Sequence, residues 1–404
     1  MTTVVPRTPE PHADGVDPAA APIPDGLPVD LAPEIVEQLG RELDEIYDAT
    51  IASLGADDER YIRRVIRAQR LLALGARVSM EAGALLRTGA KGSRRRTVGT
   101  TLLAAGTAGL GLAKVLENME IGHNVMHGQW DWMRDPEINS TTWEWDNVCP
   151  SDQWKHGHNV VHHTWTNVMG RDRDIGYEIM RTSSEQSWNP VYLAQPAYSA
   201  LLALLFEWGV GVHEVDFQKV AGTAEQRATQ VELLKGFRQK AGRQIAKDYV
   251  LWPALAGPGA PAVLVANVGA NLIRNVWSYA IIFCGHFPDG VHLFPPDVVE
   301  NETRARWYVR QMLGSANIAG GPTFHLLSGN LSFQIEHHLF PDMPSNRYQE
   351  VAPRVEALCA RYGLPYNQQR FSRQIGTTMR KIWRYALPGG QDTTTDGPAV
   401  RRAR

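Results

Sequence analysis

Two long apolar stretches place the strongest limit on how this chain can fold. Residues 97–116 (TVGTTLLAAGTAGLGLAKVL) approach the roughly 20 apolar residues that a helix needs to cross a bilayer. Residues 249–286 are long enough for two crossings, with a break at residues 257–259. Two further stretches, residues 71–86 and 191–213, include charged side chains and fit either a membrane helix or a buried core helix. The pattern therefore predicts a helical protein with membrane-spanning segments.

The two ends of the chain differ in composition from the rest. Residues 1–34 are rich in proline and poor in large apolar side chains, so they cannot offset the entropy cost of ordering. They also lack the basic start and apolar stretch of a secretory signal, and residues 387–404 are a second polar tail. We therefore expect disordered tails around one domain at residues 35–386. Helical spacing over residues 35–70 predicts amphipathic helices at its start.

Charge and cysteine content exclude several classes of protein. The chain has 41 Lys and Arg against 43 Asp and Glu, so no overall positive charge draws it to nucleic acid. Its three cysteines, Cys149, Cys284 and Cys359, include no CxxC motif and provide neither a disulfide framework nor a thiolate metal site. Any metal must therefore be bound by other ligands.

Histidines supply the most specific signal in the sequence. Seven of the thirteen fall into three compact groups, which we call boxes one to three: HNVMH (His123, His127), HNVVHH (His158, His162, His163) and QIEHH (His337, His338). The i,i+4 spacing in boxes one and two places two imidazoles on one helix face, and His163 lies next to that face. One such pair alone is more often a hydrogen-bonded core histidine, but three groups together favour a metal site.

The number of imidazoles indicates the kind of metal centre. A zinc site uses four ligands, or three and a water, so seven imidazoles exceed one zinc and suggest two metal ions. Imidazole suits iron among other metals, and neither pair encloses the glutamate of an HExxH peptidase. A dinuclear iron centre beside apolar helices indicates oxygen chemistry on a long hydrocarbon, as in a membrane desaturase or hydroxylase. A histidine-rich membrane metal carrier is the non-enzymatic alternative.

The three boxes and their flanks resemble the membrane fatty acid desaturases over residues 60–385. The segments ENMEIGHNVMHGQWDWM, NVWSYAIIFCGHFPDG and QMLGSANIAGGP are similar to those of the actinobacterial stearoyl-CoA 9-desaturases, which work with an NADPH-dependent reductase. The resemblance implies an all-α fold of about four membrane helices, with a cytosolic helical cap that holds a dinuclear iron centre. It also implies a multi-pass protein of the cell membrane with its active site on the cytoplasmic face.

The resemblance further implies which residues bind the two irons. The implied ligands are His123, His127, His158, His162, His163, His337 and His338, with an eighth, by position His286 in CGHFPDG. Gln334 stands where many relatives have the first histidine of box three, so it is either a weak ligand or an outer hydrogen-bond donor. Asp172 and Asp174 follow box two closely and are candidates to hold the outer N–H of a ligating imidazole, or else belong to a solvated turn.

The implied reaction is oxygen-dependent conversion of stearoyl-CoA to oleoyl-CoA. The variant third box keeps a front-end desaturase, acting on an already unsaturated acyl-CoA or lipid, as an alternative, and a diiron lipid hydroxylase is another. Six of the twelve tryptophans lie between residues 130 and 165 and are candidates to line an acyl channel, to lie at the bilayer interface or to pack in the core of the cap. The sequence has no HPGG haem segment and no cysteine cluster, and Gly109 and Gly111 indicate close helix packing rather than a dinucleotide loop. Electrons must then come from NADPH through a separate flavin and iron–sulfur reductase.

Charges beside the apolar stretches bear on topology. Arg77 and Glu81 have the i,i+4 spacing of a self-neutralising pair. Residues 87–96 are basic, and the positive-inside rule would place them in the cytoplasm. If residues 97–116 then crossed the membrane once, box one would lie outside the cell, away from acyl-CoA and reductant. We therefore expect residues 71–90 to cross first.

Overall fold

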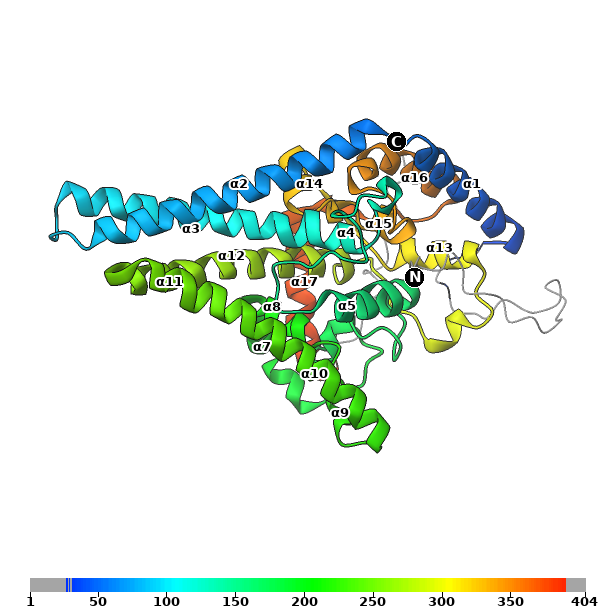
Figure 1. Ribbon diagram of the computed structural model, residues 1–404. Helices are drawn as coiled ribbons and strands as arrows, with labels where there is room; N and C mark the ends of the chain where they lie inside the picture. Colours follow the sequence, from blue (N-terminus) through cyan, green and yellow to red (C-terminus); the bar gives the residue numbers. More distant parts are fainter. Residues whose placement is uncertain (1–26, 28, 30, 390–404) are drawn as a thin grey trace.

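The computed structural model describes residues 27, 29 and 31–389, and Figure 1 shows a long helical stem that widens into a body. Most of both predicted tails, residues 1–26, 28, 30 and 390–404, lies outside the described residues. Leu27, Val29 and Leu31 pack against the core of the body, and the first helix begins at Pro33. Ordered packing therefore begins before the boundary at residue 34 that the composition predicted.

The stem consists of helices that run between the body and a distant tip. Helix α2 (Ala56–Arg87) leads out to the tip and α3 (Arg94–Leu116) returns beside it. A second pair follows the same course: η6 (Ala246–Leu251) and α11 (Trp252–Leu255) lead outward, and α12 (Ala260–His286) returns. The predicted break between this pair is the short helix η7 (Gly257–Gly259).

Small residues allow the stem helices to approach closely. A Cβ on Gly99 would lie 2.7 Å from the backbone oxygen of Gly83, and one on Gly111 would lie 2.8 Å from the side chain of Ile273 in α12. Only glycine therefore fits at these crossings, as in the small-residue interfaces of membrane helices. The predicted role of Gly111 in close helix packing is confirmed.

One continuous helix among the described residues, Arg94–Met126, is long and apolar enough to cross a membrane by length and composition. The stretch 71–86 forms the outer half of α2 and is continuous with the amphipathic part of that helix. The stretch 191–213 is divided between two short helices of the body, α7 (Gln195–Leu204) and α8 (Phe206–Val212).

A buried ionic network joins the four segments of the stem. Asp248 accepts from Arg77 Nη2 at 2.6 Å and from Lys114 Nζ at 2.9 Å, and Arg77 Nη1 donates to Asn267 Oδ1 at 2.6 Å. The expected pairing of Arg77 with Glu81 is therefore wrong, because Arg77 turns inward to Asp248 on the neighbouring segment. The charged side chains that made the apolar stretches look less suited to a membrane are therefore neutralised by partners on neighbouring helices, not by partners on the same helix.

The body is a packed assembly of shorter helices whose main core contains Leu39, Tyr308, Val351 and Val355. Its remaining α-helices are α1 (Pro33–Ala52), α4 (Asn124–Met126), α5 (Ser151–Trp154), α6 (His163–Trp165), α9 (Phe217–Val220), α10 (Ala224–Ile245), α13 (Arg304–Leu313), α14 (Pro322–Leu327), α15 (Gln334–Leu339), α16 (Tyr348–Tyr362) and α17 (Phe371–Ala386). Short 3-10 helices are η2 (Asp131–Met133), η4 (Ile175–Glu178), η5 (Pro190–Ala194), η8 (Pro296–Val299), η9 (Leu331–Phe333) and η10 (Ser345–Arg347). Two short parallel strands, β1 (Asn317–Ala319) and β2 (Gln368–Arg370), are the one departure from the predicted all-α fold among the described residues.

Candidate metal centre

Eight histidines from four parts of the chain meet in the body, where the stem helices α3 and α12 end. They are His123 and His127 of box one, His158, His162 and His163 of box two, His286 at the end of α12, and His337 and His338 in α15. The structure thus brings together every histidine that the resemblance implied as a ligand. Box three reaches the others because α15 packs between α13 and α16.

Box two lies mostly on a π-helix, and box one starts where another π-helix passes into the α-helix α4. Box one begins at the end of η1 (Glu117–His123), and η3 (Lys155–His162) carries most of box two. A π-helix bonds residue i to residue i+5 and has a wider turn than an α-helix. His158 therefore faces both His162 and His163, with ring centroids 5.1 and 4.9 Å away. The sequence predicted α-helical spacing, with His163 beside this face, whereas the wider turn brings His163 onto it.

The imidazoles form two groups. The ligand atoms of His123, His127, His158 and His337 lie within 4.8 Å of one another, as do those of His162, His286 and His338. In the first group Nε2 of His123 is 3.3 Å from Nε2 of His158. His163 lies between the groups, with ring centroids 4.7 Å from His127 and 4.4 Å from His338. This arrangement offers two neighbouring positions for metal ions.

The unpaired ring nitrogens in this cluster fit metal ligation. Nε2 of His162, His337 and His338, and both nitrogens of His127 and His163, are buried and have no hydrogen-bond partner among the described residues. A buried polar atom without a partner costs free energy, so native proteins seldom leave several together. Burial also lowers the pKa of His127, His163, His337 and His338 well below the usual range. Burial thus favours the neutral form of these four imidazoles, which keeps the lone pair that a metal requires.

Hydrogen bonds on the other ring nitrogens fix how several of these imidazoles point. His338 Nδ1 donates to Gln311 Oε1 at 3.0 Å, His123 Nδ1 donates to Asn124 Oδ1 at 2.9 Å, and His337 Nδ1 lies 3.2 Å from Tyr348 Oη. Sequence reasoning missed Asn124, Gln311 and Tyr348. Asn124 lies inside box one, and Gln311 is the first residue of a segment on which the family resemblance rests, so the sequence marked both positions. Tyr348 lies in no such motif, so nothing in the sequence pointed to it.

Asp172 and Asp174 both contact box two, so the alternative of a solvated turn is wrong. Asp172 accepts from His162 Nδ1 at 3.1 Å and is buried. Asp174 lies 3.5 Å from His162 Nδ1 and 3.9 Å from His158 Nδ1, and it also accepts from His213 Nε2 at 2.8 Å. Burial opposes a charge on His162, but the two carboxylates outweigh it and raise its pKa to about 9.

Gln334 lies against the second group of imidazoles. Its Nε2 is 3.0 Å from His286 Nε2, and its Oε1 is buried without a partner among the described residues. Two other histidines lie outside the cluster: the side chain of His156 is 65% exposed and binds Glu214, and His325 Nδ1 contacts Ser332 Oγ at 2.7 Å. His12 lies outside the described residues.

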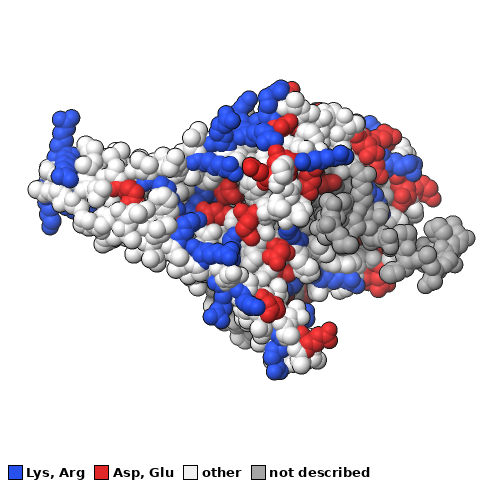
Figure 2. Space-filling model, viewed as in Figure 1, with Lys and Arg blue, Asp and Glu red and all other residues white. Residues whose placement is uncertain are grey.

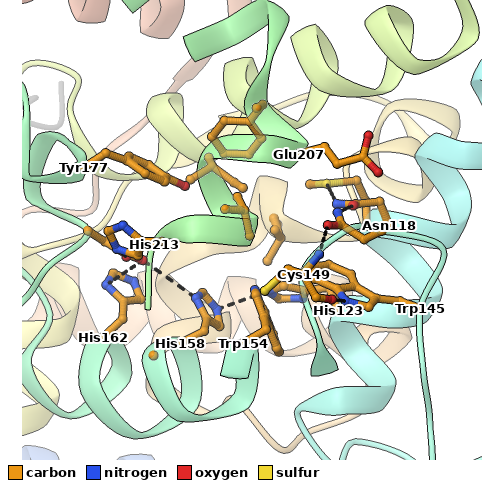
Figure 3. Close-up of a pocket in the computed structure, with 18 of the residues that line it drawn as sticks. Asn118, His123, Trp145, Cys149, Trp154, His158, His162, Tyr177, Glu207 and His213 are labelled. Carbon is orange, nitrogen blue, oxygen red and sulfur yellow. Dashed lines mark hydrogen bonds and ion pairs between the residues drawn. The ribbon is translucent and has the colours of Figure 1, made fainter. Parts of the chain in front are cut away.

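A pocket opens along one side of the histidine cluster (Figure 3). It has an empty volume of about 840 Å³, part of it open to solvent. His123, His158 and His162 line it beside Trp154. The remaining wall combines polar side chains, among them Asn118, Asp174 and His213, with the apolar side chains of Met119, Trp145, Phe206, Val210, Ile282 and Leu331. Two of the six clustered tryptophans thus line a pocket that suits a hydrocarbon chain.

One wall of the pocket follows helix α12 away from the metal centre. Arg274, Ile282 and His286 of α12 line it, and the twelve residues from Arg274 to His286 correspond to about 18 Å of helix. At the far end Arg274 forms a buried ion pair with Glu207 of α8. Along α12 the pocket wall therefore runs from an imidazole of the metal centre, past Ile282, to a buried ion pair.

Comparison with known proteins gives a consistent result. The family model of fatty acid desaturases matches residues 99–370. The chain is 46% identical over 376 residues to an NADPH-dependent stearoyl-CoA 9-desaturase of Mycobacterium tuberculosis, covering 91% of this chain and 84% of the relative. It is 24% identical over 269 residues to the sn-1 linoleoyl-lipid 6-desaturase of Synechocystis, covering 64% and 73%. Fatty acid desaturase 3 of Homo sapiens is 32% identical over 124 residues, covering 31% and 26%.

The family model spans the three boxes and the pocket wall described above. The chain is therefore an oxidoreductase of the fatty acid desaturase family.

Proposed function

We propose that this enzyme uses two irons and O₂ to introduce a cis double bond into stearoyl-CoA, giving oleoyl-CoA. The observation that carries the proposal is the pair of imidazole groups in the wall of an apolar pocket. The similarity to a stearoyl-CoA 9-desaturase over 91% of the chain supports the substrate and the position of the double bond.

The two groups of imidazoles would each hold one iron. The first iron position has His123, His127, His158 and His337, the second has His162, His286 and His338, and His163 lies between them. Gln334 is placed to complete the second group or to orient His286. When bound, the irons supply the activation of O₂ that removal of two hydrogens from an unactivated chain requires.

The residues of the chain itself supply placement and protection. Asp172 and Gln311 hold their imidazoles in one orientation, because each accepts the outer N–H of a histidine. The pocket aligns the methylene groups and excludes water, so that one pair of neighbouring carbons lies beside the metal centre. Position of the chain, rather than intrinsic reactivity of a carbon, then determines where the double bond forms.

Electrons would come from a separate NADPH-dependent reductase that carries flavin and an iron–sulfur cluster. The Mycobacterium tuberculosis relative is named as NADPH-dependent. The cysteines Cys149, Cys284 and Cys359 are buried and scattered, so they offer no cluster site. Purified enzyme with NADPH, O₂ and stearoyl-CoA should be inactive until such a reductase is added. Sustained turnover with NADPH alone, in a preparation free of other proteins, would contradict this electron path.

We further propose that the stem spans the cell membrane with the body on the cytoplasmic side. Residues 55–70 and 230–247, which precede the two outgoing segments at the body, contain five Lys or Arg each. Residues 87–96 at the tip contain five, and residues 256–261 at the other tip loop contain none. The positive-inside rule therefore favours a cytoplasmic body, and the tip cluster no longer conflicts with a cytoplasmic metal centre.

Product analysis tests the proposed reaction. Membranes that contain the enzyme and its reductase would receive stearoyl-CoA or linoleoyl-CoA, and gas chromatography with mass detection would identify the products. We expect loss of two hydrogens from stearoyl-CoA. A gain of one oxygen would indicate a hydroxylase instead, and product from linoleoyl-CoA alone would indicate a front-end desaturase.

A matched pair of variants tests the metal centre. His158→Ala removes an imidazole from the first group, whereas His156→Ala removes an exposed imidazole two residues away. Wild type and His156→Ala should contain about two irons per chain, and His158→Ala should lose iron and activity together. Active wild-type enzyme that contains one zinc and no iron would refute the proposal. Metal-loaded protein that shows no turnover with substrate and reductase would also refute it, and would indicate a metal carrier.

A further inference from the structure

Helix α2 changes character abruptly along its exposed face. In its first half Arg64, Arg67 and Arg70 are exposed. From the next residue onward the exposed side chains are apolar, and Leu71 and Leu74 are 64% and 60% exposed. An exposed apolar face that begins where an arginine row ends is what a helix shows at the boundary between lipid headgroups and hydrocarbon.

The second outgoing segment of the stem also changes from exposed arginines to exposed apolar side chains, and it does so at the same level along the stem axis. Helix α10 exposes Arg238 and Arg243, and η6 and α11, which continue it, expose Val250, Leu251 and Leu255. Asp248 of η6 binds Arg77 of α2, so this ion pair marks one common level along the stem axis from which positions on both segments can be measured. Arg243 precedes Asp248 by five residues and Arg70 precedes Arg77 by seven, which correspond to about 8 and 10 Å of helix.

We infer that Arg64, Arg67, Arg70, Arg238 and Arg243 form a basic collar that binds the phosphates of an anionic lipid leaflet on the side of the body. This inference rests on the membrane placement proposed above. No ion pair or side-chain hydrogen bond holds any of the five within the part of the chain that the structure describes. Figure 2 shows Lys and Arg interspersed with Asp and Glu where the stem widens into the body, Lys and Arg again at the tip, and a mainly uncharged surface between the two places.

The distance between collar and tip matches a bilayer. Seventeen residues separate Arg70 from Arg87 at the end of α2, which is about 25 Å of helix. The hydrocarbon core of a bilayer is about 30 Å thick, and a small mismatch is accommodated by local thinning. The collar arginines therefore reach the phosphate level of one leaflet when the apolar stem fills the hydrocarbon.

The test measures lipid binding by the full-length protein. Flotation with phosphatidylcholine vesicles first establishes insertion. Native mass spectrometry then compares bound dioleoylphosphatidylglycerol with dioleoylphosphatidylcholine for wild type, for R67Q/R70Q in the collar, and for R41Q/R354Q. Arg41 and Arg354 are exposed on α1 and α16, at the end of the body away from the stem, so this control removes the same charge elsewhere.

Wild type and the control should prefer the anionic lipid, and this preference should weaken as salt rises. Each arginine near an anionic surface contributes about five-fold, so R67Q/R70Q should bind phosphatidylglycerol roughly 30-fold more weakly. Equal losses of phosphatidylglycerol binding in both variants, or no loss in R67Q/R70Q after insertion has been confirmed, would overturn the proposed collar but not the membrane placement. Failure of wild type to insert into any vesicle would refute the membrane placement, and the collar with it.

Discussion

Asp172 offers a sharp test of how the metal centre is built. This buried carboxylate accepts from His162 Nδ1 at 3.1 Å, from the backbone N–H of Asn167 at 2.7 Å and from the backbone N–H of Asp174 at 2.9 Å. Asp172→Asn keeps the shape but replaces one acceptor oxygen with an NH₂ group that faces a donor. At least one buried donor then loses its acceptor, which costs about 1–3 kcal/mol.

The same change should weaken iron binding. Loss of the partner that orients a ligating imidazole reduces metal affinity about 10- to 100-fold, or about 1.4–2.8 kcal/mol. Titration of the iron-loaded enzyme with a chelator, with iron per chain measured by elemental analysis, gives this change directly. Asp152→Asn, which removes an exposed carboxylate, is the matched control. Identical chelator curves for Asp172→Asn and wild type would refute the orienting role.

Three further predictions concern stability and the division between ligands and other histidines. Asp58→Ala should destabilise the enzyme by about 3 kcal/mol in thermal unfolding, because Asp58 binds Arg347 and closes the start of α2. Burial opposes the charge on Asp58, but Arg347 outweighs it and lowers the pKa, so this stabilisation is present above the ordinary aspartate pKa and is lost as the pH falls through the lowered value. Arg274→Met should cost about 3–5 kcal/mol by leaving the Glu207 carboxylate buried and unpaired, and adding Glu207→Leu should restore most of the melting temperature. His325→Ala should keep normal iron content by elemental analysis, since its ring binds Ser332 rather than the metal centre.

The histidine boxes were visible in the sequence because their members are close together along the chain. Spacing alone grouped His158 with His162, and resemblance added His286, which comes 123 residues after His163. The structure brings all of them together. Spacing could not reveal the π-helices, because an extra residue in one turn leaves no mark on the pattern of residue types.

Contacts between distant segments were beyond the sequence. Arg77 and Asp248 are 171 residues apart, and their pairing depends on how two helical pairs pack. The sequence offered Glu81 as the nearer partner for Arg77, and local spacing favoured it. Tyr348 likewise reaches His337 only because α15 and α16 pack together. Local patterns therefore predicted which residues carry the chemistry, while tertiary packing determines what orients them.

The wide turn in η3 has a consequence for the length of the chain. A π-turn is equivalent to an α-helix into which one residue has been inserted. Deletion of one residue between His158 and His162 would let an ordinary α-helical ladder close. His162 and His163 would then follow His158 by three and four residues, and in an α-helix both of these positions still lie on the face of His158. The three imidazoles of box two can therefore share one face in two ways, either with the present spacing and a π-turn or with one residue fewer and an α-helix.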